Sequence, residues 1–257
     1  LATVKGQSAK VIYFLGYHRP IVEEMKEHDR GNIPLESSVA YWRKKLYVGH
    51  EEGLLSVVST QGNRQISKRI NGKPELANLS PNGRILYAGG NNGEVYTISP
   101  ALKRTRKIVL VPEGRESPNG TDINDVLYSS GRGVFVAGNY GLVALLSDKL
   151  ELIRQVALPG NEYENAQLLA FDGSVLYVGT NKNIHAIDPS SLSLLRSVEV
   201  YGRVTSLLAN NNRIYAGINS GWNNGIVAMY QPVVSGKIQA GITALWQCTS
   251  QLFSGKK

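Results

Sequence analysis

Two polar segments of the sequence gather carboxylates that could do chemistry. Asp122 lies in the segment 112–124, and Glu162 and Glu164 lie in the segment 161–165. Carboxylate and amide oxygens are the ligands of hard cations such as calcium, which takes about six to eight of them. The three side chains are therefore candidate calcium ligands, although no spaced ligand motif accompanies them. The alternative is a solvated polar loop, and no other cofactor is predicted.

The same carboxylates allow an enzymatic alternative, in which they act as acid and base at a central channel. Glu116 and Arg115 would join Asp122, Glu162 and Glu164 in a hydrolase or lyase site. The sequence contains no nucleophile-elbow, zinc-protease or phosphate-loop motif, and its four histidines show no metal-ligand spacing. The residues favour a non-enzymatic protein, and the enzymatic alternative stays open.

Side chains suited to contacts with another protein occur in segments rich in Asn and Gly. Aromatic and arginine side chains dominate the energetics of protein interfaces, and loops on a rigid framework usually carry function. We therefore expect a binding or scaffold protein that presents its loop face to a protein partner. Trp222 has an alternative role as a plug over a channel mouth. The candidate partner-binding residues are Trp222, Tyr140, His50, Arg115 and Tyr163.

A repeat explains how these loops are positioned. A short apolar or aromatic run that ends in glycine recurs at spacings of 38 to 49 residues. Periods near 40 residues are typical of β-propeller blades, each built from four strands. The longest spacing contains the segment 112–124 as an insertion. The recurring glycines are Gly49, Gly89, Gly138, Gly179, Gly217 and Gly255.

Each repeat predicts four strands separated by turn residues. The inner strands are apolar on both faces and need cover from neighbouring blades, whereas the fourth strands alternate or carry charge. The sequence predicts one all-β domain over 1–257, a six-bladed β-propeller with four-stranded blades. The last blade is expected to close with two C-terminal strands, from 242–248 and 251–254, and two N-terminal strands within 8–30. The expected blades span about 36–71, 74–111, 123–158, 166–200, 204–240, and 242–257 joined with 8–30.

The fourth repeat carries the clearest motif. Tyr177, Asn181 and Asp188 stand in the stretch LYVGTNKNIHAIDPSSLSLLRSVEV. This stretch resembles the YVTN family of propeller repeats and the related quinoprotein-like repeats of the WD40-like superfamily. The resemblance implies the propeller fold and no reaction. The tryptophan motif of quinone-binding propellers is missing, so a quinone is not implied, and we expect Tyr177 and Asp188 to be packing and turn residues.

Composition narrows the partners further. The net charge of +8 is spread along the chain, and its densest clusters, at 43–45 and 103–107, are expected to form a solvated turn and a solvated outer strand. Without a basic stripe and interleaved aromatics, nucleic acid is not the expected partner.

No apolar run approaches the roughly 20 residues that cross a bilayer. Cys248 is the only cysteine. Leu1 in place of Met is consistent with a removed signal peptide, a processed precursor or a shortened chain, and sequons stand at Asn78 and Asn119. The compartment is therefore open, with an extracellular or cell-surface location slightly favoured over the cytoplasm.

Overall fold

Antiparallel strands in groups of four build the described part of the chain. The computed structural model describes residues 39–50, 53–59, 64–70, 76, 78–159, 165–200, 202–210, 213–219, 225–230 and 243–248. Within these residues, the strands form five four-stranded sheets, which we number as blades one to five in chain order. The strands are, blade by blade, β1 (Ala40–Trp42), β2 (Lys45–Gly49), β3 (Leu54–Ser59) and β4 (Arg64–Arg69); β5 (Leu79–Pro81), β6 (Leu86–Gly89), β7 (Glu94–Ile98) and β8 (Arg104–Val109); β9 (Ile123–Ser129), β10 (Gly133–Gly138), β11 (Leu142–Leu146) and β12 (Leu152–Ala157); β13 (Leu168–Phe171), β14 (Leu176–Gly179), β15 (Asn183–Ile187) and β16 (Leu194–Glu199); and β17 (Arg203–Asn210), β18 (Arg213–Asn219), β19 (Gly225–Tyr230) and β20 (Thr243–Cys248).

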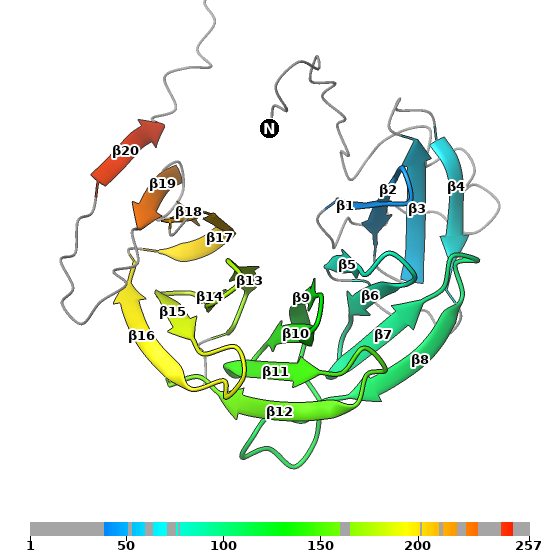
Figure 1. Cartoon of the computed structure of the whole chain (residues 1–257), viewed down its shortest axis with the longest axis horizontal. Helices are drawn as coiled ribbons and strands as arrows, with labels where there is room; N and C mark the ends of the chain where they lie inside the picture. The colour runs from blue at the N-terminus through cyan, green and yellow to red at the C-terminus, as the bar shows by residue number, and fades with distance from the viewer. Residues whose placement is uncertain are drawn as a thin grey trace, which may run out of the picture.

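The five blades lie around a common centre, with the first strand of each blade innermost and the fourth strand outermost (Figure 1). First strands of consecutive blades contact one another, from β1 and β5 through to β13 and β17. The middle strand β10 is buried along its whole length, whereas the outer strand β12 is largely exposed. These features confirm the expected all-β fold of antiparallel four-stranded blades.

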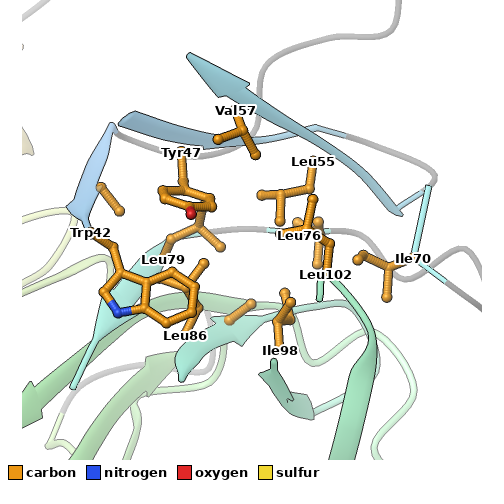
Figure 2. Packing of buried hydrophobic residues seen from close by; sticks show 12 residues of the cluster. Trp42, Tyr47, Leu55, Val57, Ile70, Leu76, Leu79, Leu86, Ile98 and Leu102 are labelled. Atoms are coloured by element: carbon orange, nitrogen blue, oxygen red, sulfur yellow. The ribbon is translucent and has the colours of Figure 1, made fainter. Parts of the chain in front are cut away.

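Hydrophobic clusters span neighbouring blades. Figure 2 shows one such cluster, in which Trp42, Tyr47 and Leu55 of blade one pack with Leu86 and Ile98 of blade two. A strand that is apolar on both faces has to be covered on both faces. A single blade cannot provide that cover, so the core forms only where blades stack against one another.

At two of the repeated glycines, Gly89 and Gly179, the next blade leaves no room for a side chain. A Cβ atom on Gly89 would lie 2.5 Å from Cγ2 of Ile123 and 2.9 Å from its carbonyl oxygen. A Cβ atom on Gly179 would lie 2.8 Å from Cγ1 of Val204. Ile123 and Val204 belong to the first strands of the following blades. At these two junctions the glycine therefore sets how closely the consecutive blades approach.

The tyrosine of the repeat links the second strand to the turn before it. In blade two, Asn82 accepts hydrogen bonds from two main-chain N–H groups of its turn and donates one to Tyr87 Oη at 2.9 Å. In blade four, Asp172 holds the turn in the same way, and Tyr177 donates to Asp172 Oδ2 at 3.1 Å. Asp188 accepts two main-chain hydrogen bonds in the turn after β15. Tyr177 and Asp188 are thus packing and turn residues, as expected.

One strand departs from the expected arrangement. Thr243–Cys248 forms β20, which pairs with β19 as the fourth strand of blade five. The prediction that 242–248 supplies the first strand of a closing blade is therefore wrong. The sequence ITALWQC is as apolar as an inner strand, so its composition does not reveal that it pairs at an outer edge. The segments 8–30 and 251–254 lie outside the described residues, and the six-blade count stays a prediction.

The basic clusters lie where the sequence predicts them. Arg43 and Lys44 form the exposed turn between β1 and β2, and the cationic residues of β8 are exposed on the outer strand of blade two. Across the described ranges, no helix is long and apolar enough to cross a membrane.

Candidate functional site

The loop between β8 and β9 folds back onto two neighbouring hairpin turns. Hydrogen bonds join it to the β6–β7 turn of blade two and to the β10–β11 turn of blade three. At the second turn, the guanidinium carbon of Arg115 lies 3.8 Å from the centre of the Tyr140 ring. We call Arg115, Asn119, Gly120 and Tyr140 the arginine–tyrosine surface. The structure thus brings together two of the five residues that the sequence proposes for partner binding.

Tyr140 has a backbone conformation that tyrosine rarely adopts. In its turn, the N–H of Leu142 donates to the carbonyl of Asn139 at 3.3 Å, and the two central residues have φ angles of 60° and 68°. Such angles are those of a type I′ hairpin turn, which prefers Asn followed by Gly. The equivalent turn of blade two has Asn92 and Gly93 at these positions, with φ angles of 54° and 72°. Tyrosine therefore stands where asparagine would be relaxed, at a cost of about 1 kcal/mol.

The β8–β9 loop holds the Tyr140 side chain in a fixed position. Besides stacking on the ring, Arg115 donates from Nη2 to the carbonyl of Asn119 at 3.4 Å. A Cβ atom on Gly120 would lie 3.2 Å from Tyr140 Oη, so glycine leaves the space that the phenol occupies. Arg115 and Asn119 are exposed, and Tyr140 is half-buried. The surface thus offers a stacked arginine and tyrosine to solvent in one geometry.

Asn139 ties this loop to blade three. Its Nδ2 donates to the carbonyl of Gly120 at 3.1 Å and to Oδ2 of Asp122 at 3.0 Å. Asp122, a candidate calcium ligand, is therefore engaged in holding the loop. Glu162 and Glu164 lie outside the described residues, so the calcium site stays a prediction. In the part of the chain that the structure describes, no three His, Cys, Asp or Glu side chains gather as a metal site.

Polar side chains also link the inner strands of consecutive blades. Asn78 of blade two donates to the carbonyl of Asn124 at 3.0 Å, and Asn124 Nδ2 donates to the carbonyl of Ala166 at 2.9 Å. Across the same junction of blades three and four, the N–H of Leu169 donates to Asp125 Oδ2 at 2.8 Å. Because an innermost strand has one edge without a sheet partner, these bonds satisfy main-chain groups that the ladder leaves open.

The junction of blades three and four contains a carboxyl group with a shifted pKa. Burial raises the pKa of Asp125 to about 7. Hydrogen bonds from the main chain of Leu169 and Val126 and from the side chain of Asn78 act in the opposite direction and lower the pKa, but burial has the larger effect. In an unfolded chain the pKa of an aspartate is about 4. A group whose pKa is higher in the folded protein than in the unfolded chain stabilises the folded state. This stabilisation is complete at a pH below the pKa of the unfolded chain, and it is lost as the pH rises through the pKa of the folded protein.

Asp125→Asn is expected to remove this pH dependence. Between about pH 4 and pH 7, the wild type should lose roughly 2 kcal/mol of unfolding free energy relative to the variant. This figure is below the full conversion of the pKa shift because Asp125 keeps part of its accessible surface. Urea unfolding of both proteins across this range measures the difference. Parallel stability curves for the two proteins would show that Asp125 does not couple the blades to pH.

The remaining candidate contact residues do not join the arginine–tyrosine surface in the described structure. His50 is only 2% exposed, and its Nε2 lies 2.9 Å from Ser56 Oγ. The prediction that His50 contacts a partner is therefore wrong, because Ser56 of β3 holds the ring inside blade one. Trp222 and Tyr163 lie outside the described residues, so their roles stay predictions.

Known structures share the fold of this chain. No protein-family model and no curated protein matches the sequence. A chain in the crystal structure of the mitotic checkpoint complex is similar with a TM-score of 0.65 and 17% identity, over 85% of this chain and 66% of that one. The WD40 domain of Neurospora crassa Pan2 has a TM-score of 0.60 and 14% identity, over 77% and 62%. The computationally designed Ika8 protein has a TM-score of 0.60 and 16% identity, over 84% and 63%.

These similarities show that the chain has a β-propeller fold similar to that of the Pan2 WD40 domain. The chain spans a little under two thirds of the length of each similar structure, between 62% and 66%. At such identities the shared property is the fold alone, and the function has to be argued from the site.

Proposed function

We propose that this β-propeller is a non-enzymatic protein-binding scaffold, and that it contacts its partner through the arginine–tyrosine surface. The observation that carries the proposal is Tyr140 in the left-handed turn position, where blade two has the relaxed residue Asn92. Backbone strain of this kind clusters at functional sites, where the surrounding structure maintains it. Partner binding gives a reason for a tyrosine at this position.

The chemistry of the surface supports a protein partner. Tyrosine and arginine are enriched among the residues that contribute most to interface energetics. Arg115 and Tyr140 are already ordered by stacking, so little side-chain entropy is lost when a partner binds. The mitotic checkpoint complex is by its name an assembly, and a propeller chain within it has a similar fold. That use of the fold supports the same use here.

Site-specific photo-crosslinking tests the proposal. A benzoyl-phenylalanine at position 140 should yield a discrete protein adduct in an extract of the source organism. The matched control carries the same group at Arg84, an exposed residue in the β5–β6 turn at the other end of the blades, whose hydrogen bond there uses only the main chain. The adduct should be absent from this control. Identical adducts at both positions, or none at position 140, would overturn the proposal.

The alternative of a hydrolase or lyase receives no specific support from the described residues. Asp122 accepts a hydrogen bond from Asn139, and Glu116 is exposed on the loop. Arg115 stacks on Tyr140. Glu162 and Glu164, the other proposed acid and base groups, lie outside the described residues.

Two finer features belong to the same proposal. The first is a ring of six blades, which the regular spacing of six repeat glycines supports. The second is a place at a cell surface, where a rigid propeller would present its loop face to another macromolecule. Neither feature is needed for the contact between the arginine–tyrosine surface and a partner.

A further inference from the structure

All of the excess positive charge of the chain lies in the first two blades. Residues 39–111 contain twelve Lys and Arg against four Asp and Glu, an excess of eight, and the rest of the chain contains sixteen of each kind. The expectation that the net charge is spread along the chain is therefore wrong, because acidic residues offset the cations everywhere else. Blades one and two are neighbours on one side of the ring (Figure 1). A charge imbalance confined to one side of a molecule favours an anionic partner.

The fold gathers five of these cations at one end of the two blades. Because the strands are antiparallel, the β1–β2, β5–β6 and β7–β8 turns lie at the same end. The rung that pairs Leu86 with Ile98 continues to Arg104, so Arg104 lies at the end that carries the β5–β6 turn. The first strands β1 and β5 contact each other, so these ends of the two blades adjoin. We call five exposed residues there the basic end: Arg43, Lys44, Arg84, Lys103 and Arg104.

In the described part of blades one and two, the basic end carries no carboxylate. The carboxylate described in these blades is Glu94, which begins β7 at the opposite end and pairs with Lys107 at 2.6 Å. The guanidinium carbon of Arg43 lies 5.1 Å from the centre of the Trp42 ring, and Arg104 lies over a buried tyrosine in a similar way. Such contacts position a guanidinium without neutralising its charge. The cations of the basic end are therefore available to an anion from outside.

The β1–β2 turn holds two of these cations in a conformation that they rarely adopt. Arg43 and Lys44 have φ angles of 49° and 61°, and Trp42 pairs with Lys45 across the turn. These angles are those of a type I′ turn, which prefers Asn followed by Gly. Backbone strain of this kind clusters at functional sites. An anionic ligand gives a reason for arginine and lysine at two positions where asparagine and glycine would be relaxed.

The surroundings of the basic end favour a narrow polyanion that carries bases. On blades three and four, the turns at the same end contain Asp148, Asp172 and Asp188, which a flat anionic membrane would also meet. The side chain that the described structure exposes next to the cations is an aromatic ring, that of Tyr41. It is 59% exposed and stands two residues, about 7 Å along the strand, before Arg43. An exposed aromatic ring beside cations can stack a base while the cations bind phosphates.

We propose that the basic end binds single-stranded nucleic acid, with its cations on the phosphates and a base stacked on Tyr41. Both contacts act on any base sequence, so binding is expected to be independent of sequence. Nucleic acid is not the partner expected from the sequence, because the cations come from three separate turns and form no stripe along the chain. They come together only when the two blades stack. The basic end lies opposite the arginine–tyrosine surface and does not depend on the function proposed there.

Fluorescence anisotropy of a fluorescein-labelled DNA strand of about 20 nucleotides and mixed sequence tests the basic end. With the whole chain, the logarithm of the affinity should fall with the logarithm of the salt concentration with a slope of about −3, as expected for about four to five phosphate contacts on a single strand. Arg43→Asn combined with Lys44→Gly removes two cations and relaxes the turn, so it should not lower the midpoint of urea unfolding. It should raise the Kd at least about tenfold at about 50 mM salt and bring the slope nearer to zero by about 1.4.

A charge-matched variant and a matched ligand provide the controls. Arg154→Gln combined with Lys182→Gln removes two exposed cations outside the basic end and should leave the Kd and the slope unchanged. The wild type should bind an abasic strand of the same length about tenfold more weakly than the strand with bases, and Tyr41→Ala should remove this difference. Tyr140→Asn should leave the Kd unchanged, so failure here is distinguishable from failure of the proposed scaffold function.

Three outcomes would overturn the proposal. Equal losses in the two double variants would mean that net charge governs binding, and that the basic end does not. Equal affinity of the wild type for strands with and without bases would mean that the surface does not recognise nucleic acid as such. The third outcome is binding of phosphatidylserine vesicles through Arg43 and Lys44 when the DNA strand does not bind.

Discussion

Tyr140→Asn is expected to weaken partner binding by about thirtyfold while leaving the stability of the fold nearly unchanged. The binding loss corresponds to the roughly 2 kcal/mol that an interface hot spot contributes. Asparagine relieves about 1 kcal/mol of backbone strain in the type I′ turn. The lost stacking of Arg115 on the ring costs about the same at an exposed site. Binding is measured with the partner recovered by crosslinking, and stability by urea unfolding.

The reverse substitution in blade two provides the control. Asn92→Tyr places a tyrosine in the equivalent turn and removes the hydrogen bond from the Gly120 N–H to Asn92 Oδ1. It should lower the unfolding free energy by about 1 to 2 kcal/mol, the cost of a strained tyrosine and one lost hydrogen bond. If Tyr140→Asn itself destabilises the protein by that much, the account of strain is wrong. If Tyr140→Asn binds the partner with wild-type affinity, the arginine–tyrosine surface is not part of the interface.

Gly89→Ala is expected to lower the unfolding free energy by about 3 kcal/mol, the upper range for overpacking in a core. The new methyl group would meet both the side chain and the carbonyl oxygen of Ile123, within 2.9 Å. A flexible side chain can move aside, but the carbonyl belongs to the first strand of blade three and cannot move without shifting that blade. We expect urea unfolding to show this loss as a lower transition midpoint with an unchanged m-value.

Gly83→Ala separates this steric effect from a general cost of replacing glycine. Gly83 has a φ of 85°, and a Cβ atom there would meet nothing within 4 Å. The variant should therefore lose only about 1 kcal/mol, from backbone strain alone. Equal losses in the two variants would mean that the close approach of blades two and three is not what requires glycine at position 89.

The blade framework could be predicted from the sequence because it depends on a pattern that repeats. The glycine at the end of the second strand and the tyrosine before it can be recognised from a few neighbouring residues. Each is required by contacts within one blade or between that blade and the next. Gly89 faces Ile123, and Tyr87 bonds to Asn82 five residues earlier. Blade four repeats both contacts, with Gly179 against Val204 and Tyr177 bonded to Asp172, so the spacing of the repeat locates them.

Pairing at the ends of the chain was not predictable in the same way. The sequence of β20 is apolar, which is typical of an inner strand, and yet it pairs with β19 at an outer edge. Whether an apolar strand lies inside or outside depends on which neighbour it meets, and a single repeat contains no information about that neighbour. His50 illustrates the same limit, since its burial depends on Ser56 across the turn.

The sequence could name Arg115 and Tyr140 as candidate contact residues, but it could not indicate that they stack on each other. Both are residue types that favour protein contacts, and both stand in segments between predicted strands. Their stacking depends on how a long loop returns across two blades, which no spacing encodes. The strain at Tyr140 could have been inferred, because Asn139-Tyr140-Gly141 aligns with Asn91-Asn92-Gly93 in the repeat. Asp125 gave no such signal, since its role depends on Leu169 of the next blade.

The bonds between inner strands bear on how a propeller of this kind can change in evolution. The N–H of Leu169 and the carbonyl of Ala166 find their partners on blade three, so a fragment that begins with blade four carries main-chain groups that no strand of its own satisfies. Duplication or exchange of one blade would break such a junction on each side. Blades are therefore poor units of recombination here, and a viable exchange has to carry Asn124 and Asp125 together with the strand they bind.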